Sequence, residues 1–164
     1  MMTITRFGHE NTKTRRVSKY GFRAFVVSWL FLVGGGAGMM AQEPAAPRTI
    51  EKGDQSNIDD VRQVVVRTAA EWTKLWQQHN PDRPRPAVDF FTEMVVGVFM
   101  GSRPNAGFST TIISATAGNG ALIVRYKETK PSAGAVTAQV LTFPYHLVAI
   151  PKATVTDVKF DKTE

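Results

Sequence analysis

The sequence predicts an α+β domain that is mainly antiparallel β-sheet, with one α-helix covering a face of the sheet. Three observations lead to this fold class. Short segments rich in β-branched residues recur between residues 61 and 160, one stretch at 68–79 has helical periodicity, and turn residues separate the strand-like segments. A chain of 164 residues is long enough for one such domain with a buried core.

Residues 1–41 are predicted to be an export leader. Six basic residues and one acidic residue precede an apolar run at 24–33, which is the layout of a secretory signal peptide. Small residues after this run predict cleavage after Ala37 or Ala41. The alternative is an uncleaved N-terminal hydrophobic anchor, in which the apolar segment continues to Met40. We therefore expect an exported protein, either periplasmic or secreted.

The basic character of the chain is concentrated in this leader. The whole chain has 20 basic and 14 acidic residues, so the part after the leader holds 14 basic and 13 acidic residues. A nearly neutral domain produces no strong field for phosphates, and nucleic-acid binding is not expected. The chain contains no cysteine, which excludes disulfides, thiolate metal ligands and a cysteine nucleophile.

Residues 42–54 are predicted to be a flexible linker, because proline and alanine are frequent in their first half. The domain itself is expected at residues 55–164. Its first predicted strand contains the valine run at 64–66, whose β-branched side chains favour a strand.

The one predicted helix follows this strand. Thr68 and Glu71 have the spacing of a capping box, in which each side chain accepts a backbone N–H of the first turn. Trp72, Leu75 and Trp76 recur at helical spacing and share one face, so we expect them to pack in the core rather than bind a ligand. An Asn-Pro pair ends the helix.

The rest of the domain is predicted to alternate strands and turns. Residues 94–100 are almost all apolar, which predicts a central strand buried on both faces. Asn119 and Gly120 form a strong hairpin signal, because both positions of that turn favour positive φ. Because short turns join successive strands, antiparallel pairing is expected. The further predicted strands are 108–117, 121–128, 136–143, 145–152 and 155–160.

A loop with two glycines follows the predicted central strand. Gly101 ends the strand, Pro104 fixes φ, and Gly107 permits a left-handed turn. The loop lacks a phosphate-binding pattern and leads into a strand rather than a helix, which argues against a nucleotide site. Arg103 and Asn105 are expected to be exposed, and loops carried on a rigid sheet are common places for recognition.

Two parts of the sequence resemble the C-terminal domain of the PrcB family, named after a subunit of a protease complex. The family pattern has an acidic-aromatic pair, an apolar strand that ends in glycine, and a glycine loop with a basic residue and a proline. A later strand begins with proline and an aromatic residue and is followed by lysine. The matching positions are Asp89, Phe90, Gly101, Arg103, Pro104, Gly107 and Phe108, then Pro144, Tyr145, His146, Leu147, Val148 and Lys152.

The resemblance covers about residues 55–160 and departs from the family pattern at Ala106, where the family has a glycine. It implies an exported, non-catalytic domain that accompanies or stabilises a surface protease complex, with a protein as its partner and no cofactor. The candidate binding residues lie in the glycine loop and in the strand led by proline. They are Gly101, Arg103, Pro104, Asn105, Gly107, Tyr145 and His146.

Few residues after the leader could support catalysis. His79 lies at the end of the predicted helix, where it could interact with the last carbonyl groups. His146 is next to Tyr145 in a predicted strand, so their side chains are expected on opposite faces. Asp89 either pairs with Arg103 or marks the entry to a strand. Neither a nucleophile elbow nor a metal-binding pattern is present, so we expect a domain that is not an enzyme and holds no metal.

Three functions remain open from the residues alone. The first is an exported accessory or protein-interaction domain, associated with an envelope or secreted protease complex. The second is a domain that binds a small ligand or an envelope polymer through the Arg103 loop and nearby aromatic residues. The third is a periplasmic hydrolase that uses Asp89 or His146. The resemblance favours the first.

Overall fold

The computed structural model describes residues 46–164, except residue 119. All described residues belong to one compact unit, Met40–Glu164. The predicted export leader at 1–41 lies outside the described residues, as does the start of the predicted linker at 42–45.

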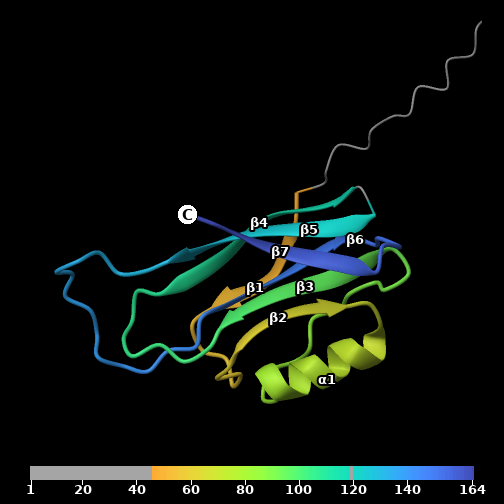
Figure 1. Cartoon of the computed structure of the whole chain (residues 1–164). Coiled ribbons are helices and arrows are strands. Elements are labelled where there is room, and N and C mark those ends of the chain that lie inside the picture. The colour runs from red at the N-terminus through yellow and green to blue at the C-terminus, as the bar shows by residue number, and fades with distance from the viewer. Residues whose placement is uncertain (1–45, 119) are drawn as a thin grey trace, which may run out of the picture. The chain divides into compact units, whose positions relative to one another are not determined.

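The described residues form one helix and two β-sheets that lie in three layers (Figure 1). The four-stranded sheet is the middle layer, with the helix on one face and the three-stranded sheet on the other. The elements are β1 (Arg48–Gly53), β2 (Val61–Val66), α1 (Ala69–His79), β3 (Glu93–Met100), β4 (Ser109–Gly118), β5 (Ala121–Thr129), β6 (Tyr145–Pro151) and β7 (Asp157–Thr163).

The sheet topology confirms the predicted α+β class and corrects one detail of it. The four-stranded sheet has the order β1-β6-β3-β2 and is antiparallel, and β4 and β5 form an antiparallel hairpin. The expectation of antiparallel pairing throughout is wrong at β7, which runs parallel to β5. The chain passes through β6 in the other sheet before it returns beside β5, so these two neighbours are not joined by a short turn.

β1 corrects the predicted boundary between linker and domain. Residues 48–53 lie inside the predicted flexible linker at 42–54, but they form an edge strand paired with β6. Arg48 also donates two hydrogen bonds to the Glu93 carboxylate, at 2.7 and 3.3 Å. The prediction failed because the proline and alanine residues that suggested a linker end before this strand begins.

β3 is buried on both faces, as predicted. Val95 and Phe99 pack in the cluster beneath α1, whereas Met94, Val96 and Val98 pack against the three-stranded sheet. Two separate apolar clusters therefore lie on the two faces of β3. One is covered by α1 and the other by the three-stranded sheet.

α1 begins with the predicted capping box. The Glu71 N–H donates to the Thr68 hydroxyl at 3.2 Å, and the Thr68 N–H donates to the Glu71 carboxylate at 3.1 Å. Trp72 and Trp76 are buried, and their indole N–H groups donate to carbonyl oxygens of the irregular loop after the helix, at 2.9 and 2.8 Å. The predicted core role of this aromatic face is confirmed.

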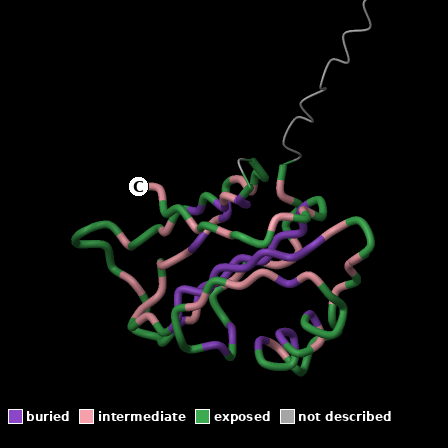
Figure 2. The backbone as a smooth tube through the Cα atoms, turned by 45° about the vertical axis from the view of Figure 1, so that its right-hand side comes forward, coloured by how far each residue is buried: buried purple, intermediate pink, exposed green. Residues whose placement is uncertain are grey.

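The segment predicted as a strand at 136–143 belongs to neither sheet. Its only bridge in the described residues is an isolated one between Thr142 and Arg103. The chain here leaves the sheets between β5 and β6 and projects beyond them (Figure 1), and most of the projecting part is exposed (Figure 2). Its valines and threonines favour a strand locally, but a strand needs a partner strand, and none of the described strands pairs with this segment.

Candidate functional site

Two irregular stretches project together from one end of the sheets. We call residues 101–108, between β3 and β4, the support loop, and residues 131–142, between β5 and β6, the outer segment. They contain most of the residues that the sequence marked as a binding site. The projecting end is therefore the candidate functional site.

The support loop turns at its two glycines, as predicted. Gly101 has φ of 70° and Gly107 has φ of 94°, a region that favours glycine. A Cβ on Gly101 would lie 2.8 Å from the Asp59 carbonyl oxygen, and one on Gly107 would lie 3.0 Å from Pro131 Cγ. Gly107 thus lets the support loop lie directly against the start of the outer segment.

Backbone hydrogen bonds tie the two stretches together. The Arg103 N–H donates to the Thr142 carbonyl at 2.8 Å, and the Thr142 N–H donates back to Arg103 at 2.9 Å. The Ala106 N–H donates to the Ala138 carbonyl at 3.0 Å, and the Thr142 hydroxyl donates to the Asn105 carbonyl at 3.1 Å. The support loop therefore fixes the second half of the outer segment.

Arg103 and Asn105 are half-buried, whereas the sequence predicted exposed side chains. The Arg103 guanidinium donates to the Ser102 carbonyl at 3.0 Å and lies over the Phe108 ring, 5.9 Å from its centroid. Of the predicted loop residues, Pro104 and Gly107 are exposed. Arg103 and Asn105 contribute more to the contact between the two stretches than to a free surface.

The outer segment carries the exposed apolar side chains of this end. Val136 is fully exposed, and the exposed fractions of Val140 and Leu141 are 49% and 54%. No charged residue occurs from position 131 to position 145. Three exposed aliphatic side chains that lie within six residues of an uncharged stretch form a candidate contact surface.

A shallow cavity of about 400 Å³ lies beside the outer segment. Apolar side chains of Leu141 and Phe143 form one part of its lining, and polar residues that precede β2 or follow β3 form the rest. The lining residues are Ser56, Asn57, Asp59, Ser102, Leu141 and Phe143.

Behind this cavity lies a buried polar network centred on His79, which is 1% exposed. The Ser56 hydroxyl is 2.7 Å from His79 Nδ1, and His79 Nε2 is 3.2 Å from Glu51 Oε2. Because an ionised carboxylate can only accept, His79 carries its proton on Nε2 and accepts from Ser56 at Nδ1. Arg83 donates to the other oxygen of Glu51. Burial lowers the pKa of His79, so the imidazole is neutral at pH 7.

A hydroxyl, an imidazole and a carboxylate in this order also occur in hydrolases, but the surroundings here favour a structural role. Ser56 is 4% exposed, and its oxygen already accepts the Ile58 N–H at 3.0 Å. The Asn57 N–H donates to the His79 carbonyl at 2.9 Å, so His79 interacts with the loop before β2 rather than capping its own helix. The network attaches that loop to the end of α1.

Tyr145 and His146, both predicted binding residues, are buried and point to opposite faces of β6, as expected for neighbours in a strand. Tyr145 packs beneath α1, where burial and the nearby Glu51 carboxylate raise its pKa to about 12. Neither side chain reaches the surface formed by the outer segment.

His146 joins the two sheets. Its Nδ1 accepts the Ile112 N–H at 2.8 Å, so the ring proton is on Nε2, which donates to the Thr49 hydroxyl at 3.0 Å. This bond satisfies a backbone group at an irregularity in the β4–β5 ladder. Burial, and to a lesser extent the charge of Lys52, lower the pKa of His146 to about 4. Both nitrogens are occupied, which does not suit the general base that the sequence left open.

Asp89, the acidic residue that the sequence left open for catalysis, forms hydrogen bonds within a turn. Asp89 accepts the Phe91 N–H at 3.0 Å and the Thr92 hydroxyl at 2.9 Å, so it forms the turn at the entry to β3 rather than a pair with Arg103. Among the described residues, no group of three His, Cys, Asp or Glu side chains could hold a metal ion.

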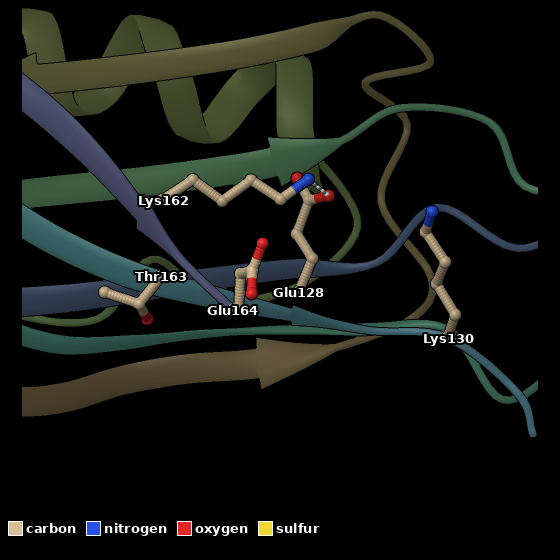
Figure 3. Close-up of a pocket in the computed structure, with 5 residues that line it drawn as sticks. All are labelled: Glu128, Lys130, Lys162, Thr163 and Glu164. Carbon is tan, nitrogen blue, oxygen red and sulfur yellow. Dashed lines mark hydrogen bonds and ion pairs between the residues drawn. The ribbon is translucent and has the colours of Figure 1, made fainter.

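A second open pocket, of about 470 Å³, lies at the ends of β5 and β7 (Figure 3). The Lys162 ammonium meets the Glu128 carboxylate there, whereas Lys130 stands apart from that pair. The hydrogen bond that the Lys162 ammonium donates to the Glu128 carboxylate raises the pKa of Lys162. The two opposite charges pair with each other, and Lys162 and Lys130 are exposed to solvent, so this pocket is a weaker candidate.

The fold and the site define a small β-rich α+β domain whose distinctive feature is a projecting, uncharged segment held on a glycine loop. The predicted family resemblance is confirmed for one part of it: residues 94–151 match the family described as PrcB C-terminal. That range begins in β3, ends with β6, and includes the support loop and the outer segment. No curated protein and no solved structure matches the chain. None of the described helices is long and apolar enough to cross a membrane.

The sequence did not reveal two parts of the site. Ser56 and Glu51 are far from His79 along the chain, and no spacing pattern links them. The sequence did contain a signal for the irregular outer segment. Residues 131–145 carry no charge, and Gly134 and several alanines give a strand little side-chain surface to pack.

Proposed function

We propose that this protein is an exported, non-catalytic accessory domain that binds another protein through the outer segment. The observation that carries the proposal is the set of three exposed aliphatic side chains, Val136, Val140 and Leu141, on a segment whose second half is fixed by hydrogen bonds to the support loop. A fixed apolar segment loses little conformational entropy when it binds, so it suits recognition better than a free loop does.

The resemblance supports a setting for this contact. The PrcB family takes its name from a subunit of a protease complex, and the range that matches it contains both projecting stretches. We therefore propose a protease or another envelope protein as the partner class. The basic and apolar pattern of residues 1–41 supports export.

The non-catalytic part of the proposal draws on His79 and His146, the two histidines among the described residues. Both imidazoles are buried, have lowered pKa values, and use both ring nitrogens in hydrogen bonds. Such side chains are poorly placed to exchange protons with a substrate.

The test is site-specific photo-crosslinking in cells that produce the full chain. A photoreactive amino acid replaces Val136 or Val140, and the matched control replaces Lys159, which is exposed in β7. We expect one defined adduct from the first two positions, identified by mass spectrometry, and none from Lys159. Adducts that are absent, or identical at all three positions, would contradict the proposal.

A variant separates this function from hydrolysis. His146→Gln removes the imidazole that the sequence left open as a general base, and it leaves the outer segment and the cavity beside Leu141 untouched. Its amide can still accept the Ile112 N–H. We expect the same adducts in the same yield from this variant when its fold is intact by circular dichroism. Loss of the adducts in a folded His146→Gln protein would contradict a capture that needs no catalytic histidine.

A further inference from the structure

We infer that the cavity beside Leu141 takes a lysine or arginine side chain of the bound partner. This inference rests on the proposed function and names the chemistry that the partner must have. The partner segment would be apolar where it meets the outer segment and would carry one cationic side chain.

The apolar part of the recognition comes from two sides of the cavity. Leu141 belongs to the exposed set of the outer segment, and Phe143 follows two residues later; both line the cavity. The methylene stem of a lysine or arginine can cover such surface while its charged end remains in a polar environment.

The charge comes from the loop that precedes β2. Residues 53–60 contain Asp54, Asp59 and Asp60 and no basic residue. Asp60 is paired with Arg62, but Asp54 and Asp59 form no ion pair with the described residues. Asp59 lines the cavity, and the Asp54 carbonyl accepts the Phe143 N–H at 2.7 Å, so both acidic residues flank the apolar lining.

The basic residues around this end have other partners. Arg103 lies over the Phe108 ring and bonds to the Ser102 carbonyl, and Arg83 pairs with Glu51. Arg103 forms no ion pair with the described residues, so its charge offsets one of the two unpaired carboxylates, Asp54 and Asp59. The net charge of these groups is still negative, which favours a cation and disfavours an anionic partner.

The acidic loop is also held in place before any partner arrives. Ser56 and Asn57 bond to the His79 side chain and carbonyl, and the Ser102 N–H donates to the Asp59 carbonyl at 2.9 Å. The buried His79 network and the Ser102 bond thus hold the backbone that carries Asp59 beside the cavity. A preformed site of about 400 Å³ is large enough for one long side chain.

The test uses three small probes of similar shape with the isotope-labelled full chain, followed by NMR chemical-shift titration. n-Butylguanidinium is the cation, n-butylurea is its neutral counterpart, and pentanoate is the anion. We expect saturable shifts at the amides of Asn57, Ser102 and Leu141, with n-butylguanidinium binding about five-fold tighter than n-butylurea and pentanoate not binding. Raising the salt concentration should reduce this preference.

Variants locate the charge that causes the preference. Asp54→Asn combined with Asp59→Asn should make n-butylguanidinium and n-butylurea bind equally, while the matched control Asp161→Asn, on β7, should preserve the difference. Leu141→Ser should weaken both probes. Unchanged melting temperatures of the variants show that the fold is retained.

Two results would overturn the inference: equal binding of the cation and the neutral probe to the unmodified chain, or no shifts with any probe. If either occurs while photo-crosslinking at Val136 still captures a defined protein, the charge assignment fails and the proposed function stands. If the cation binds as expected but crosslinking captures nothing, the cavity assignment stands and the proposed function fails.

Discussion

β3 and the outer segment both contain β-branched residues, but their surroundings are opposite. Each residue of β3 from Met94 to Met100 is buried, and the strand has ladder partners on both sides. The outer segment also contains valines and threonine, but it is held by a few hydrogen bonds to the support loop and exposes its aliphatic side chains. The difference shows that β-branched residues become a strand only where a neighbouring strand and a covering layer are both supplied.

The largest expected effect comes from placing the same charge in each region. Val96→Asp buries a carboxylate between the two sheets without a partner and should cost several kcal/mol, enough to prevent folding. Val136→Asp should change the free energy of unfolding by less than about 0.5 kcal/mol, because that side chain is fully exposed. Urea denaturation followed by circular dichroism measures both, and similar losses would remove the contrast between the regions.

The second prediction concerns His146, which joins the two sheets through hydrogen bonds to Ile112 and Thr49. The outer segment has no such buried titratable group. The pKa of His146 is lowered to about 4 in the folded protein from 6.5. Above pH 6.5 the residue is neutral in both states, but between pH 6.5 and 4 the unfolded chain binds the proton and the folded protein does not. Stability should therefore fall by about 3 kcal/mol as the pH drops through this window, and then level off.

Unfolding curves at a series of pH values check this sign and size. His79, whose pKa burial also lowers, adds a loss in the same direction. The variant His146→Gln has no imidazole to protonate at this position, so most of the pH dependence should disappear. Its amide can still accept the Ile112 N–H, so the contact between the sheets is kept. An unchanged pH dependence in that variant would assign the loss to other groups.

The third prediction tests how tightly β3 is covered. A Cβ on Gly97 would lie 2.6 Å from Leu147 Cδ2 and 2.8 Å from Val64 Cγ2. Gly97→Ala should therefore destabilise the domain by about 2 kcal/mol through overpacking. A melting temperature equal to that of the unmodified chain would mean that β2 and β6 can move apart more easily than their burial suggests.

The smallest effect is expected where the two projecting stretches meet. Gly107→Ala places a side chain at φ of 94° and close to Pro131, which should cost about 1 kcal/mol. The loss should be local, so amide hydrogen exchange at Ala106 and Thr142 should accelerate while that of β3 stays slow. Faster exchange throughout β3 would show that the support loop belongs to the core.

The sequence predicted the interior of this domain better than its projecting end. Residues 94–100 and the face of Trp72 and Trp76 were predicted correctly, because local periodicity reports directly on burial. β1 and the outer segment were missed in opposite directions: a strand appears in the expected linker, and an irregular stretch appears in an expected strand. Both outcomes depend on β6, since one segment pairs with that strand and the other only leads into it.

The His79 network shows a different limit. The sequence placed His79 at a helix end, but its bonds to Ser56 and Glu51 depend on how the loop before β2 folds against α1. Such a contact between distant parts of the chain leaves no spacing signal. The cavity was not predictable for the same reason, because its lining comes from three separate loops.

The order of the strands also has a consequence for how the chain folds. β6 lies between β1 and β3, although residues 54–144 separate it from β1 and contain both β4 and β5. Neither sheet can be completed from a continuous stretch of chain, and only the β4–β5 hairpin closes a short loop. Refolding should accordingly be slow for a domain of this size. Before β6 pairs with β3 during folding, one edge of β3 has no hydrogen-bonded partner and its valines are uncovered on that side. We expect the chain to be most prone to aggregation at this stage.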